Sequence, residues 1–107
     1  MPDEAAPAFS VSRVSHRALG TLVQLQFGPE FVLRLTPSEA SSLSFAFVAV
    51  RDGISPEREI YISPVASDAS FTGLVDENGI SVITPDGALK LDWAETGKLA
   101  AAIAEAV

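Results

Sequence analysis

The first clear pattern along the chain is an alternation of apolar and polar positions at residues 9–35, which is typical of β-strands. Residues 9–18 alternate weakly, whereas residues 21–27 alternate clearly between an apolar and a more polar face. The Gly-Pro-Glu sequence at 28–30 indicates a turn, and a third alternating run follows at 31–35. The pattern therefore predicts three short strands, joined as antiparallel neighbours.

The strongest local signal is a helix start at Thr36. Thr36 and Glu39 have the spacing of a capping box, in which each side chain accepts a hydrogen bond from the other residue's backbone N–H. Pro37 occupies the first helical position, where its missing N–H costs nothing. Gly53 marks the end, because glycine readily adopts the left-handed conformation that closes a helix. These signals predict a helix over residues 37–52.

One side of this helix lacks charge. Phe45 and Ala49 lie opposite the main apolar stripe, Val48 lies between the two faces, and no charged residue occurs between Glu39 and Arg51. A helix on a small sheet normally exposes a charged side. We therefore expect Phe45, Val48 and Ala49 to form an interface, covered either by another element of the chain or by a second copy. The stripe expected to face the sheet consists of Ala40, Leu43, Ala46, Phe47 and Val50.

The rest of the chain indicates more strands and a second helix. Alternating runs occur at residues 59–63, 70–75, 80–84 and 89–91. We predict a hairpin turn centred on Asn78 and Gly79, since both residue types tolerate positive φ. Asp92 and Glu95 form a second capping box, which opens an amphipathic helix that reaches Val107.

Together these elements predict the α+β class. We expect a mostly antiparallel sheet of six to seven short strands with two helices, in the order β-β-β-α-β-β-β-(β)-α. Strands and long helices do not alternate regularly, which disfavours a parallel sheet. We expect a single α+β domain over residues 9–107, preceded by a disordered lead at residues 1–8 that is rich in proline and acidic residues.

Composition excludes several classes of function. The chain has 107 residues, a net charge of -7 and no cysteine, so it forms no disulfide framework, zinc ribbon or thiol nucleophile. Its acidity opposes the phosphate contacts that drive nucleic-acid binding. No signal peptide or membrane-spanning stretch is recognisable, and we expect a cytoplasmic protein without a membrane or nucleic-acid partner.

The sequence offers little support for catalysis. His16 is the single histidine, no serine lies in a nucleophile-elbow motif, and the scattered glycines form no phosphate-binding loop. We expect no catalytic residue, no metal site and no cofactor. Arg13, His16 and Arg17 form a small basic spot on the first predicted strand. This spot is either a contact for an anionic ligand or an acidic partner, or a set of solvated residues that protects a strand edge.

Association is the function that the sequence favours. Asp76, Glu77 and Asp86 occur at predicted turns, and we interpret them as turn formers. Our preferred hypothesis is a small non-enzymatic protein that acts as a homodimer or as a subunit, through the helix surface around Phe45. One alternative is a small-ligand-binding or enzymatic domain with a pocket between helix and sheet. The other is an acidic regulatory module that masks a basic surface of its partner.

Overall fold

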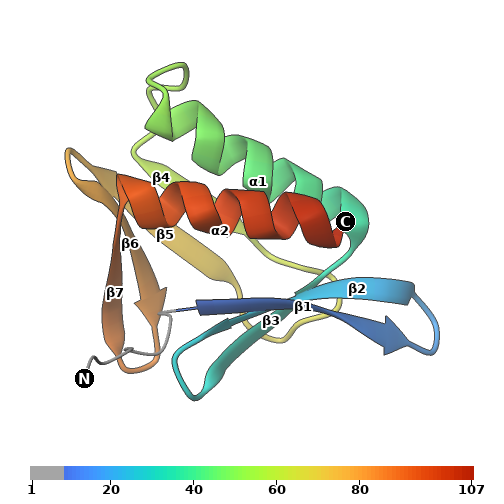
Figure 1. The fold of residues 1–107 in the computed structure, drawn as a ribbon. Coiled ribbons are helices and arrows are strands. Elements are labelled where there is room, and N and C mark those ends of the chain that lie inside the picture. The colour runs from blue at the N-terminus through green and yellow to red at the C-terminus, as the bar shows by residue number, and fades with distance from the viewer. Residues whose placement is uncertain (1–8) are drawn as a thin grey trace, which may run out of the picture.

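The computed structural model describes residues 9–107. Within that region seven strands and two helices follow the predicted order, which confirms the α+β class (Figure 1). The expected disordered lead, residues 1–8, lies outside the described residues. No helix of the described region is long and apolar enough to cross a bilayer. The elements are β1 (Phe9–His16), β2 (Gly20–Phe27), β3 (Phe31–Leu35), α1 (Pro37–Arg51), β4 (Glu59–Ile62), β5 (Phe71–Asp76), β6 (Gly79–Thr84), β7 (Gly87–Asp92) and α2 (Trp93–Ala106).

The first three strands form an antiparallel sheet in the order β1-β2-β3. Its register joins Phe9 to Phe27 at one end of β1 and His16 to Gly20 at the other. One face of β2 and β3 is buried, as the alternating pattern predicts. The buried residues of that face are Val23, Leu25, Phe27, Phe31, Leu33 and Leu35.

The last four strands form a second antiparallel sheet in the order β4-β5-β6-β7. The predicted centre of the β5–β6 turn is wrong by one residue, because Asp76 pairs with Gly79 and the loop residues are Glu77 and Asn78. The Asp76 side chain causes the shift. Its Oδ1 accepts hydrogen bonds from the backbone N–H groups of Asn78 (2.7 Å) and Gly79 (3.0 Å). Only Gly79 of the predicted pair has a positive φ, at +153°.

Both predicted capping boxes are present. Thr36 Oγ1 accepts from the Glu39 backbone N–H (3.2 Å), and Glu39 Oε1 accepts from that of Thr36 (2.9 Å). Asp92 and Glu95 make the same reciprocal pair at the start of α2. Gly53 follows α1 with φ +74°, in the left-handed region that the end of a helix favours. These local signals explain why the helix ends agree closely with the prediction.

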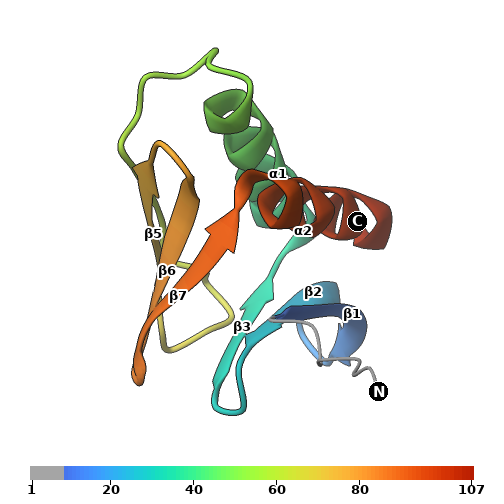
Figure 2. The same ribbon diagram turned by 60° about the vertical axis from the view of Figure 1, so that its left-hand side comes forward.

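The two sheets and the two helices enclose one hydrophobic core. The helices lie side by side, and the sheets diverge from them on either side of that core (Figures 1 and 2). Phe71 of β5 lies at its centre, with ring centroids 5.9 Å from Phe27 of the first sheet and 5.6 Å from Phe47 of α1. Aromatic pairs at such separations pack favourably. The core therefore joins elements from both halves of the chain.

The loop before β5 ties the second half of the chain to the first. The Ser67 hydroxyl accepts a hydrogen bond from the Arg34 backbone N–H (2.6 Å) and donates one to the Arg34 carbonyl (3.0 Å). The Ser67 hydroxyl thus forms hydrogen bonds with backbone groups at the free edge of β3. Glu39 Oε2 accepts from the Val65 backbone N–H (3.1 Å), so the carboxylate that caps α1 also holds this loop.

Candidate functional site

Helix α2 covers part of the uncharged side of α1. The two helices run antiparallel (Figure 1), and the buried Ser44 hydroxyl donates a 2.9 Å hydrogen bond to the Ala100 carbonyl of α2. Near the other end, Arg51 lies across Gly97, where an added Cβ would be 2.8 Å from Arg51 Nη1. Helix α2 therefore covers the serine-rich side of α1 around Ser44. The sequence pattern did not identify α2 as the covering element.

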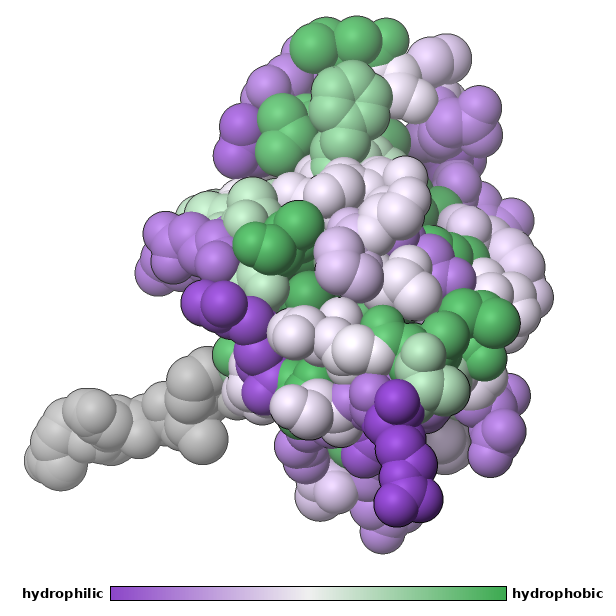
Figure 3. Space-filling model, turned by 90° about the vertical axis from the view of Figure 1, so that its right-hand side faces the viewer, coloured by the Kyte–Doolittle hydropathy of each residue, from purple (hydrophilic) through white to green (hydrophobic). Residues whose placement is uncertain are grey.

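A groove remains on the outer side of the helix pair. Phe45 lies in it with 72% of its surface exposed, beside the half-buried Val48. The groove measures about 360 Å³, and no charged side chain lines it. Its lining residues are Ser41, Ser44, Phe45, Val48, Ala104 and Val107. Figure 3 views the side of the molecule that holds the C-terminus, where residues of intermediate hydropathy fill the middle and strongly hydrophilic ones gather at the margins.

The three residues of the predicted interface differ in exposure. Phe45 and Val48 are accessible from the groove, but Ala49 is only 7% exposed and does not line it. The turn that ends α1 lies against Ala49, whose carbonyl accepts hydrogen bonds from the backbone N–H groups of Ile54 (2.9 Å) and Ser55 (3.1 Å). The groove also includes Val107, which is 50% exposed. The sequence pattern assigns Val107 to the apolar side of α2 but does not predict that it lies near Phe45.

The three residues of the predicted basic spot do not converge. Arg13 and His16 are separated by an odd number of positions on β1, so their side chains lie on opposite faces of the sheet. Arg17 lies in the turn after the strand. His16 Nδ1 accepts hydrogen bonds from the backbone N–H groups of Ala18 (3.1 Å) and Leu19 (3.0 Å). This histidine therefore stabilises the β1–β2 turn, and its Nδ1 is already engaged.

Among the acidic residues at the turns, Asp76 makes local hydrogen bonds through its carboxylate and Asp86 makes one through its backbone N–H. Asp76 binds the backbone of its own turn, and the Asp86 N–H donates to the Thr84 hydroxyl (3.2 Å). No three metal-ligating side chains gather anywhere in residues 9–107. The ion pair of this region joins Arg51 Nε to Asp52 Oδ1 (2.9 Å), and that hydrogen bond and charge raise the pKa of the Arg51 guanidinium above its usual value. The pair is exposed at the end of α1.

The space between α1 and β4, one place where a ligand could lie between helix and sheet, is small. A pocket of about 100 Å³ lies between α1 and β4, beside Ser42, Leu43 and Tyr61. Pockets for small molecules usually measure about 300–1,000 Å³ and combine apolar walls with converging polar groups. The pocket between α1 and β4 is smaller than this range.

Comparison with known proteins adds no functional assignment: no family model, no curated protein and no solved structure matches the chain.

Proposed function

We propose that this protein acts by association rather than by catalysis, and that it pairs with a second copy through the groove between α1 and α2. The observation that carries the proposal is Phe45, an aromatic side chain that is 72% exposed at the middle of a helix. Burial of apolar surface yields about 25 cal/mol per Å². Covering the exposed Phe45 ring with another molecule therefore contributes favourable free energy to association.

Charge opposes a second copy least at this groove. The chain has a net charge of -7, so two copies repel each other through most of their surfaces. No charged side chain lines the groove, and this repulsion is weakest there. In a two-fold symmetric contact the same groove meets itself, so that each Phe45 packs against the apolar lining of the other copy.

The small size of the domain gives pairing an additional benefit. A chain of this length buries roughly 65% of the surface that its unfolded form exposes. Contact between two grooves adds buried apolar area without changing the core. We therefore expect the dimer to unfold at a higher temperature as protein concentration rises.

Sedimentation velocity of the wild type and of Phe45→Glu tests the proposal. The wild type should sediment as a dimer and Phe45→Glu as a folded monomer, because the introduced carboxylate would be buried without a partner. Ile54→Glu is the matched control, since Ile54 is 75% exposed and lies just beyond α1, outside the groove lining. It should remain dimeric. A wild type that is monomeric at every concentration, or a Phe45→Glu variant that remains dimeric, would refute the proposal.

A further inference from the structure

The sheet β4–β7 has an outer face that no element of residues 9–107 covers. In Figure 2 the helices and the other sheet all lie on the opposite side of it. Three large apolar side chains point outward there, with exposed fractions of 61% for Tyr61, 45% for Leu74 and 39% for Ile83. An antiparallel sheet often exposes one polar face to water, but this face is partly apolar. It is separate from the groove around Phe45.

The apolar residues of this face are neighbours rather than scattered positions. Leu74 pairs with Glu59 on one side and with Ser81 on the other, and Tyr61 and Ile83 lie two residues farther along their strands. Such diagonal neighbours are about 7–8 Å apart and within reach of long side chains. We call this the outer patch; it consists of Tyr61, Leu74, Ile83 and Ala88, the last of which pairs with Ile83.

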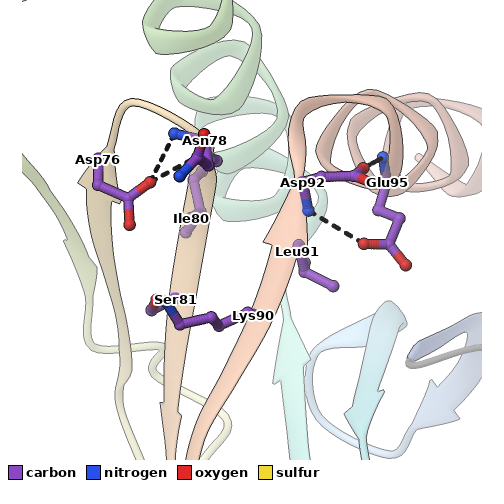
Figure 4. Close-up of a pocket in the computed structure, with 9 residues that line it drawn as sticks. Asp76, Asn78, Ile80, Ser81, Lys90, Leu91, Asp92 and Glu95 are labelled. Carbon is purple, nitrogen blue, oxygen red and sulfur yellow. Dashed lines mark hydrogen bonds between the residues drawn. The ribbon is translucent and has the colours of Figure 1, made fainter.

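An acidic hollow lies beside the outer patch, at the end of the sheet where α2 begins. It measures about 270 Å³, with Asp76 on one side and the reciprocal Asp92–Glu95 pair on the other (Figure 4). Each of these carboxylates uses one oxygen in its turn or cap. The second oxygen of each makes no hydrogen bond within residues 9–107. Lys90 is the one basic side chain that lines the hollow within that range.

We propose that this face docks a partner protein that presents apolar side chains next to lysine or arginine. The outer patch supplies apolar contact area, and the free carboxylate oxygens supply acceptors for an ammonium or guanidinium group. A second copy is disfavoured here, because it has the same net charge of -7 and therefore repels the carboxylates of the hollow. This docking is independent of pairing through the groove, and it uses a different surface of the molecule.

Isothermal titration with a synthetic amphipathic helical peptide, leucine on one face and lysine beside it, tests both features. The leucine peptide should bind more tightly than a matched peptide with serine in place of leucine, and its affinity should fall as salt rises. Leu74→Ser should weaken binding about tenfold, because it removes a central apolar contact. Phe45→Glu should bind the peptide as the wild type does, which separates this proposal from pairing through the groove.

Two charge substitutions should change the affinity for the peptide in opposite directions. Lys90→Glu should tighten binding about threefold, and Glu59→Lys should weaken it by a similar factor. Arg17→Glu is the matched control for Lys90→Glu, since it changes the net charge equally but lies in the β1–β2 turn of the other sheet. If Arg17→Glu tightens binding as much as Lys90→Glu, the affinity depends only on the net charge of the protein and the proposal is wrong. Equal affinity for the leucine and serine peptides would also overturn it.

Discussion

Replacement of Gly79 by alanine should destabilise the fold more than the same change at any other glycine of residues 9–107. Gly79 begins β6 directly against β7, with φ +153°, a backbone conformation that residues with a side chain rarely adopt. An added Cβ would overlap the carbonyl oxygen of Leu91 and lie 2.8 Å from the Cα of Asp92. Both are backbone atoms, and Asp92 is also the N-cap of α2. Neither can move without displacing β7 from β6 or the helix from its cap.

The cost has two parts. Holding alanine in an unfavourable backbone conformation costs about 1–3 kcal/mol. Inserting a methyl group into occupied space costs about 1–3 kcal/mol more. The sum, roughly 4 kcal/mol, is a large part of the 5–15 kcal/mol that typically stabilises a domain, and it should lower the Tm by more than about 15 °C.

Urea unfolding followed by far-ultraviolet circular dichroism measures this loss, and Trp93 fluorescence provides a local signal. The Trp93 indole N–H donates to the Glu77 carbonyl (2.9 Å), so it reports on the turn that Gly79 follows. Gly97→Ala is the control: its Cβ would meet only the flexible end of Arg51, and alanine is favoured in a helix by about 1 kcal/mol. We expect Gly97→Ala to be neutral or stabilising. A Gly79→Ala variant as stable as the wild type would refute the close pairing of β6 with β7.

Substitutions at two further positions test the helices. Ser44→Ala should lower the free energy of unfolding by about 1 kcal/mol, because it removes the buried hydrogen bond to Ala100; an unchanged urea midpoint would show that this bond contributes nothing. Thr36→Ala should also cost about 1 kcal/mol through loss of the α1 cap, and Thr36→Ser should recover most of that loss. Equal destabilisation by both Thr36 variants would contradict the capping role of its hydroxyl.

The sequence predicted best those features that depend on neighbouring residues. Both helix starts follow from capping boxes within four consecutive positions, and the structure contains the predicted hydrogen bonds. The strands of the first sheet follow from alternation and from a glycine-containing turn. The β5–β6 turn was displaced by one residue for a reason that is also local. The Asp76 side chain accepts hydrogen bonds from two backbone N–H groups of the turn. The prediction considered only the preference of Asn-Gly pairs for hairpin turns and not this side chain.

Features that depend on distant parts of the chain were less accessible. The strands are divided between two sheets, and neither strand count nor alternation determines that division. The burial of Ser44 depends on a carbonyl of α2, which lies 56 residues away in the sequence. Ala49 is buried because the chain folds back after α1. Of the three residues predicted to form an interface, Phe45 and Val48 line the groove, beside a residue of α2 that a single-helix pattern cannot show.

The most direct test of association through the groove is an isotope-filtered nuclear Overhauser experiment on mixed labelled and unlabelled protein. It detects contacts between protons of different copies only. We predict signals between the Phe45 ring of one copy and the methyl groups of Val48 or Val107 of the other, since these side chains line the same groove. A dimer whose intermolecular signals arise only from other surfaces, or a protein without such signals at concentrations where it sediments as a dimer, would contradict pairing through the groove.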